Sequence, residues 1–466
     1  MNRIRKSFIN WLITILFLFS IPLLSQEEKK DELKGLKFTG LPLISFSTDD
    51  GFGYGVRIYG TYYEEGYAPF KFQTYGQFYQ TTKGFEYHEF SIDSLKFLGS
   101  PLRVRMNIGL ERYLNAQFYG YNNFQDIPRQ KKIKAGELPI NENFQSTPTL
   151  YKVNDAITLN TNYLSNPNPL DITNYNKSEK ELKESQDKYF NYDSIKPFFT
   201  ITTEDFIGNT NFKWFAGIRL QRYKIQSYQN DVDKGQFYPN IKTKIDHEKP
   251  IGYDATEKPK FVNTIRLAFA YDSRPRIREL NPNDGIFTDF HYEGSGKATG
   301  ANYTFHRYTL TFRQYIEIFS NIFKSIDKEL VFAYRIQTQK TDGNVPFFEA
   351  GRIYTMRESA LGMGGNNGIR GYPANQFVDR VMGVFNTELR FTSFRVSALG
   401  GIDFVILAYY DVGRVAPSYK EFVFKDFHRA AGGGLRLVWQ RNTIINISYG
   451  RSQYEANGNF SFNHMF

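Results

Sequence analysis

The chain has 466 residues, a formal net charge of +10 and no cysteine, and 17% of its residues are aromatic. The absence of cysteine excludes the disulfide-rich scaffolds found among small secreted proteins. The positive charge is not accompanied by any nucleic-acid-binding motif, so a DNA- or RNA-binding function is not expected.

Residues 1–26 have the order of a secretory signal peptide. Arg3, Arg5 and Lys6 precede an apolar run over residues 11–24, and small or polar residues follow. A positively charged start, an apolar centre and a polar cleavage region are the signature of export. We therefore expect this segment to be removed, and residues 27–37 to form a short periplasmic link.

Alternation of polar and apolar residues dominates the remaining chain, 38–466. For example, Val104 and Met106 alternate with Arg103 and Arg105. A period of two indicates strands whose two faces meet different surroundings. Many aromatics and a low mean hydropathy of −0.49 favour a transmembrane β-barrel with an apolar outer face and a wet, polar lumen. A soluble β-sandwich is the alternative, but its strands would not repeat this pattern along nearly the whole chain.

The strand-like segments number about sixteen. In chain order they are 39–48, 52–64, 70–81, 85–94, 102–113, 197–206, 212–225, 262–272, 285–293, 303–319, 329–339, 381–394, 402–415, 430–439, 443–454 and 460–466. An even number places both chain ends on the periplasmic side. The polar stretch 115–188 lacks alternation and is predicted to be a long extracellular loop.

A glycine-rich loop precedes the strand-like segment 381–394. Residues 362–372 are rich in glycine and carry Arg370 near the tip. In the following segment Phe385 and Leu389 share one face, while Glu388 lies on the other. The alternation therefore predicts that Glu388 points away from the lipid.

Several sequence blocks resemble one family. They are Tyr-Asp-Ser-Arg at 271–274 with Asn-Pro-Asn-Asp-Gly at 281–285, Asn-Gly-Ile-Arg-Gly-Tyr at 367–372, Glu-Leu-Arg-Phe at 388–391 and Tyr-Asp-Val-Gly-Arg at 410–414. Together they resemble the bacterial surface-antigen superfamily, which includes the BamA and TamA outer-membrane insertases and the two-partner-secretion transporters. The resemblance implies a sixteen-stranded outer-membrane barrel whose sixth extracellular loop, here 340–380, plugs the lumen.

The resemblance also implies roles for individual residues. The loop latch would be Gly368, Arg370, Gly371 and Tyr372, and the partners of Arg370 on the barrel wall would be Glu388 and Asp411. The last strand would close against the first, at a seam that contains Phe460, Phe462 and Phe466. In relatives this weak seam serves the insertion of client proteins.

The function implied by the resemblance is help with insertion or translocation of proteins at the outer membrane. The expected partners are outer-membrane lipid and lipopolysaccharide, client outer-membrane proteins and a separate periplasmic protein. A periplasmic partner is expected because the link is too short for the POTRA domains that most members carry. We expect no enzymatic activity, no cofactor, no metal and no nucleic acid. The alternatives are a passive channel or structural barrel, and an adhesin that uses 115–188 as its outer surface.

Overall fold

A computed structural model describes residues 34–47, 50–65, 67, 70–100, 102–121, 127, 130, 151–153, 156–158, 189–226, 243–275, 278, 281–326, 328–356, 359–396, 402–439 and 443–461. The predicted signal peptide and most of the predicted loop 115–188 lie outside these residues. The seam residues Phe462 and Phe466 also lie outside them.

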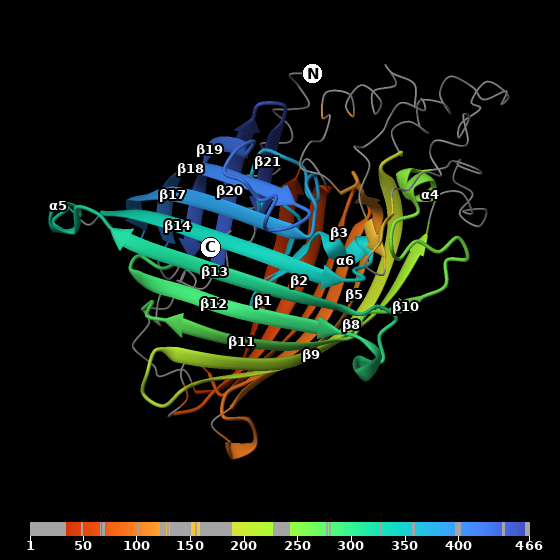
Figure 1. Ribbon diagram of the computed structural model, residues 1–466. Coiled ribbons are helices and arrows are strands. Elements are labelled where there is room, and N and C mark those ends of the chain that lie inside the picture. Colours follow the sequence, from red (N-terminus) through yellow and green to blue (C-terminus); the bar gives the residue numbers. More distant parts are fainter. Residues whose placement is uncertain are drawn as a thin grey trace, which may run out of the picture.

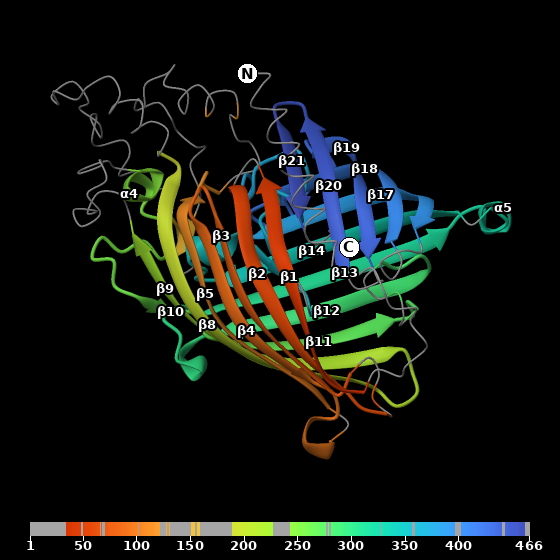
Figure 2. The same cartoon turned by 180° about the vertical axis from the view of Figure 1, so that it is seen from behind.

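Sixteen strands in the described part of the chain form one antiparallel sheet that closes on itself. They are β1 (Gly35–Ser47), β2 (Gly51–Tyr63), β3 (Phe72–Thr81), β4 (Phe85–Ser94), β5 (Arg103–Gln117), β8 (Asn191–Phe206), β9 (Phe212–Gln226), β11 (Thr264–Asp272), β12 (Gly285–Ser295), β13 (Phe305–Glu317), β14 (Glu329–Gly343), β17 (Val381–Val396), β18 (Ile402–Ala416), β19 (His428–Trp439), β20 (Thr443–Ser452) and β21 (Ala456–Ser461). The two-residue β10 (Lys260–Phe261) also pairs with β9. Figures 1 and 2 show the barrel from opposite sides. The predicted all-β barrel of about sixteen strands is confirmed.

Short elements occupy the connections between these strands. They are η2 (Phe97–Gly99), α4 (Lys244–Glu248), η7 (Lys297–Thr299), α5 (Ser320–Lys324) and α6 (Phe347–Ala350), with the hairpins β6 (Tyr151–Val153)–β7 (Ala156–Thr158) and β15 (Arg352–Tyr354)–β16 (Ser359–Leu361). Among the described residues, no helix has both the length and the apolar character needed to span a membrane.

The barrel wall separates two environments, as the alternation predicts. Along β13, Arg307, Thr309 and Thr311 are fully buried, whereas Tyr308 and Leu310 between them are 37% and 49% exposed. Since successive side chains of a strand point to opposite faces, the apolar set faces outward and the polar set faces the interior. The interior is therefore lined with charged groups that have to satisfy one another.

Several strands extend beyond the segments that alternation predicts. β1 begins at Gly35, inside the predicted link, and β14 runs to Gly343, inside the predicted loop 340–380. The last residue of β14 still pairs with Phe305 of β13. Backbone pairing needs no apolar side chain, so the ladders continue where the hydrophobic pattern has ended.

The two rims of the barrel differ in the length of their connections. Long connections follow β5, β9 and β14 on one rim, and on the other rim the longest connection is the turn 273–284. β1 starts at the rim with the shorter turns. In outer-membrane barrels short turns face the periplasm, so this rim is the periplasmic one.

Candidate functional site: the loop between β14 and β17

Residues 344–380 connect β14 to β17 and contact the inner face of the barrel wall at both ends of the loop. Two glycines explain how the chain folds so tightly there. Gly371 has φ +111°, and a Cβ on it would lie 3.2 Å from Ala430 Cβ. A Cβ on Gly364 would lie 1.7 Å from the carbonyl oxygen of Pro373. Larger residues at these two positions would force the loop away from its neighbours.

Arg370 bonds both predicted carboxylates. Its Nε and backbone N–H donate to Asp411 Oδ2 at 2.8 and 3.0 Å, and its Nη2 donates to Asp411 Oδ1 at 2.8 Å. Its Nη1 donates to Glu388 Oε1 at 2.6 Å. Arg370 is 6% exposed and both carboxylates are fully buried. The structure therefore brings together the three charged residues that the sequence analysis named.

The register of β17 and β18 determines which wall residues lie next to the Arg370 guanidinium. Glu388 lies opposite Tyr409, and Asn386 lies opposite Asp411. The Arg370 guanidinium carbon lies 3.5 Å from the centre of the Tyr409 ring. Three wall residues thus offer two carboxylates and an aromatic face to one cation, and the fourth, Asn386, lies beside Asp411.

Asn386 connects this ion pair to the backbone of the loop. Its Nδ2 donates to Asp411 Oδ1 and to the carbonyl oxygen of Gly368, both at 2.8 Å. Arg335 on β14 donates to Asn386 Oδ1 and, at 2.7 Å, to the carbonyl oxygen of Asn367. The glycine-rich turn is therefore held through its carbonyl groups as well as through Arg370.

Two further arginines share Glu388. Arg390 Nε lies 2.8 Å and Arg436 Nη2 lies 3.1 Å from Glu388 Oε2. The same two arginines reach the periplasmic turn between β11 and β12, where they donate to Pro282 O and Asn281 Oδ1, each at 3.5 Å. The sequence analysis did not name either arginine as a site residue. Arg390 could have been found from the sequence, because it lies two residues after Glu388 and therefore on the same face of the strand. Arg436 could not, because its place beside Glu388 depends on the register of the strands.

Tyr372 is the remaining residue of the predicted latch. It is 2% exposed, and its ring lies 5.1 Å from the Phe377 ring and 5.8 Å from the His428 ring. Its carbonyl oxygen accepts a hydrogen bond from Asn457 Nδ2 at 3.5 Å. Tyr372 thus packs the end of the glycine-rich turn against β19 and β21.

A second cluster, which the sequence analysis did not find, holds the first half of the loop. Glu349 on α6 is fully buried. Its carboxylate lies 3.4 Å from Arg219 of β9 and 3.2 Å from Arg307 of β13, and it accepts a hydrogen bond from the Tyr223 hydroxyl. Arg307 also donates to the carbonyl oxygen of Glu349 at 2.8 Å. Here the loop supplies the anion and the wall supplies the cations.

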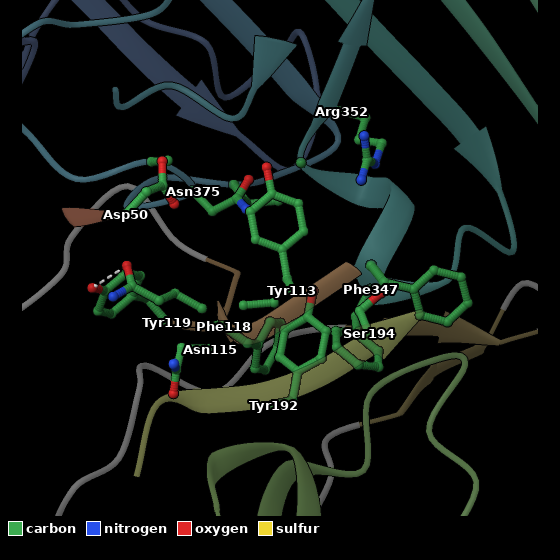
Figure 3. Close-up of a pocket in the computed structure, with 17 residues that line it drawn as sticks. Asp50, Tyr113, Asn115, Phe118, Tyr119, Tyr192, Ser194, Phe347, Arg352 and Asn375 are labelled. Atoms are coloured by element: carbon green, nitrogen blue, oxygen red, sulfur yellow. Dashed lines mark hydrogen bonds between the residues drawn. The ribbon is translucent and has the colours of Figure 1, made fainter. Parts of the chain in front are cut away.

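Arg352, three residues later, attaches the loop to a third part of the wall. Its Nη2 lies 2.5 Å from Glu111 Oε1 of β5, which Lys196 of β8 also contacts at 2.6 Å. Beside this contact is a cavity of about 90 Å³ between β5, β8 and the loop. Figure 3 shows Arg352 and Phe347 from the loop together with Tyr113 and Tyr192 from the strands around this cavity.

The surroundings of Arg370 and Glu349 favour the charged form of each side chain. Burial by itself lowers the pKa of Arg370, but Asp411 and Glu388 raise it above the ordinary value. Burial by itself raises the pKa of Glu349, but Arg219 and Arg307 lower it below the ordinary value of 4.5. Both ends of the loop therefore carry full charges that are neutralised by the wall.

The predicted seam is described only in part. Phe460 of β21 pairs with Phe46 of β1 and with Ile447 of β20. In the described ranges, no group of three or more histidine, aspartate or glutamate side chains is arranged to hold a metal ion.

The sequence pattern of the Omp85 superfamily domain matches residues 73–464. No curated protein matches the sequence. BamA from Haemophilus ducreyi lacking POTRA domains 1–3 matches with a TM-score of 0.51 at 12% identity, over 92% of this chain and 70% of that one.

Two CdiB structures also match. The one from Acinetobacter baumannii has a TM-score of 0.48 at 10% identity and covers 93% of this chain. The one from Escherichia coli has a TM-score of 0.49 at 8% identity and covers 91%. The chain spans 60% and 62% of their respective lengths.

Proposed function

The chain belongs to the Omp85 superfamily, and on this premise we propose that it assists the insertion or translocation of proteins at the outer membrane. Barrels of this superfamily lie in the outer membrane and act as transporters or insertases, not as enzymes. Client outer-membrane proteins and a separate periplasmic protein that delivers them are part of the proposal. Pull-down of co-purifying periplasmic proteins tests for the separate periplasmic protein.

The observation that carries this proposal is the closing seam. β21 is described as far as Ser461, and up to there it shares two registered pairs with β1. β1 and β21 are neighbours in the wall although no turn joins them, so the barrel can open here without breaking a hairpin. An opened strand edge presents N–H and C=O groups that can pair with an incoming strand.

The loop has a complementary role in the proposal. Gly368, Arg370, Gly371 and Tyr372 act as a latch that keeps the loop inside the lumen. The ion pairs of Arg370 with Glu388 and Asp411 support this assignment, because β17 and β18 lie in the C-terminal half of the wall that leads to the seam. A closed lumen maintains the permeability barrier while the seam handles the client chain.

A cysteine lock tests the proposal without changing the loop. The chain has no cysteine of its own, so the pair Phe46→Cys and Phe460→Cys places one disulfide across the seam. The matched control is Phe46→Cys with Phe52→Cys. Phe46 pairs with Phe52 of β2 as well as with Phe460 of β21, so the control disulfide links β1 to β2 and leaves the seam unchanged. In reconstituted vesicles the oxidised seam variant should lose its acceleration of the folding of an unrelated barrel and regain it on reduction.

The hairpin control should keep full activity in the same assay. Equal acceleration by the oxidised seam variant and the control would contradict the seam mechanism. The alternative, a passive channel or structural barrel, predicts no acceleration by any variant and a steady bilayer conductance that is indifferent to replacement of Arg370.

A further inference from the structure

The turn between β13 and β14, residues 318–328, carries an exposed apolar surface on the periplasmic rim. Phe319, Ile322 and Ile326 are 64%, 63% and 58% exposed. All three lie in or directly beside the short helix α5. Figure 1 shows α5 projecting beyond the ends of β13 and β14. Water is an unfavourable environment for three large apolar side chains in one place.

Several backbone amides of this turn are paired within the turn itself. The amides of Ile322 and Phe323 donate to the carbonyl oxygen of Phe319 at 2.9 and 3.0 Å. The amides of Ile326 and Lys328 donate to the carbonyl oxygen of Phe323 at 3.2 and 2.8 Å. The Ser325 hydroxyl is also used within the turn, because it donates to the carbonyl oxygen of Ile322 at 2.7 Å. A segment with these groups paired internally can enter an apolar medium at low cost.

The apolar surface is continuous with the lipid-facing surface of the barrel. The Phe323 ring lies 5.8 Å from the ring of Phe391 on β17, in an edge-on contact. Phe391 belongs to the outward-facing set of β17 with Leu389 and Phe385, which are 41% and 40% exposed. The turn is thus joined to the outer face of the wall, and not to the lumen or to the polar loops of the opposite rim.

We propose that residues 318–328 insert into the periplasmic leaflet of the outer membrane and anchor this part of the barrel rim at the lipid interface. The occupant of the apolar surface is the boundary between lipid headgroups and acyl chains. Phe319, Ile322 and Ile326 enter the acyl region, and Lys328 at the end of the turn is placed to meet lipid phosphate groups. This anchor lies on β13 and β14, the two strands that precede the loop described above.

Site-specific labelling tests the anchor in the full chain. Because the protein has no cysteine, Ile322→Cys can carry a single environment-sensitive nitrobenzoxadiazole label. Asn209→Cys is the matched control, since Asn209 is exposed in the β8–β9 turn on the same rim. Both variants are reconstituted into vesicles of phosphatidylcholine and phosphatidylglycerol, and heat-modifiable gel migration verifies that each barrel is folded.

The label at position 322 should show blue-shifted emission, lose intensity when the lipids carry a nitroxide high on the acyl chain, and resist aqueous iodide. The label at position 209 should respond in the opposite way to both quenchers. Iodide quenching at position 322 equal to that at position 209, with no effect of the nitroxide lipid, would overturn the proposal. That result would leave the apolar surface free for a periplasmic protein instead of lipid.

Discussion

At the scale of single residues, the shape of the cation at position 370 matters as much as its charge. Arg370 makes a two-point contact with Asp411 and, through a third nitrogen, reaches Glu388. A guanidinium offers several donors in one plane, whereas a lysine ammonium is a compact charge. Glu388 has two other arginine partners, Arg390 and Arg436, so the loss of Arg370 affects Asp411 most.

Arg370→Ala should lower the free energy of unfolding by about 3–5 kcal/mol, because the buried carboxylate of Asp411 loses its charged partner. We expect a value near the lower end of this range, because Glu388 keeps Arg390 and Arg436. Arg370→Lys should restore part of this loss but not all of it. Urea unfolding in detergent micelles, followed by tryptophan fluorescence, measures both. The control is Arg429→Lys, which changes an exposed arginine on β19. Equal stability of Arg370→Lys and this control would show that the planar contact is not needed.

At the scale of the element, the loop is attached at both ends with opposite charges. In its first half Glu349 faces Arg219 and Arg307, and in its second half Arg370 faces two carboxylates. The first attachment lies on β9 and β13, and the second on β17 and β18. Movement of the whole loop out of this position therefore has to break both clusters as well as the contact between Arg352 and Glu111.

Glu349→Gln keeps the shape of the side chain but leaves Arg219 and Arg307 with Glu293 as their shared carboxylate. We expect the first half of the loop to leave the wall, and single-channel recordings to show more frequent openings than in the unmodified protein. Glu421→Gln, an exposed change in the β18–β19 connection, is the control. Recordings of Glu349→Gln that match this control would contradict the attachment of the loop through Glu349.

Acidification gives an independent measurement of the same cluster. A carboxylate whose pKa is lowered on folding stabilises the fold above its ordinary pKa, and that contribution is lost only as the pH falls through the lowered value. The pKa of Glu349 is lowered from 4.5 by Arg219 and Arg307 against the effect of burial. The contribution of Glu349 should therefore stay unchanged from about pH 7 to about pH 5, so the unmodified protein and Glu349→Gln should differ in channel openings by the same amount at both ends of this interval. A difference that shrinks toward pH 5 would show that Glu349 takes up a proton there.

At the scale of the whole molecule, one junction of the barrel wall differs from the others. β13 is connected along the chain to both of its neighbours, and it shares eleven registered pairs with β12 and thirteen with β14. β1 and β21 are neighbours that no turn joins, and β21 is described only as far as Ser461. Backbone amides exchange with solvent when their hydrogen bonds open, so the proposed seam mechanism predicts less protection in β1 than in β13.

Hydrogen–deuterium exchange on the reconstituted protein should therefore give faster uptake in peptides from β1 than in peptides from β13. β13 is a suitable internal standard because it is paired on both sides along its length. The oxidised Phe46→Cys, Phe460→Cys variant should slow exchange in β1 and leave β13 unchanged. Uptake in β1 as slow as in β13 without the lock would rule out a weak seam.

Much of the fold was predictable from the sequence because strand alternation is a local property. Residues such as Val104 and Met106 face outward or inward according to their parity alone. Repetition of that pattern, with many aromatics and a low hydropathy, indicated a closed barrel with an apolar outer surface. The family resemblance added Arg370, Glu388 and Asp411 as a set, and the structure places their charged atoms within hydrogen-bonding distance.

Tertiary structure alone decided which charges meet across the interior. Glu349 contacts Arg219, which is 130 residues away in the chain, and Arg352 contacts Glu111, which is 241 residues away. Alternation reveals which face a residue occupies, but not which residue of another strand lies at the same height. That height depends on the register of every intervening strand pair and on the path of the loop. The attachment of the loop through Glu349 and Arg352 is therefore defined only when the barrel is closed.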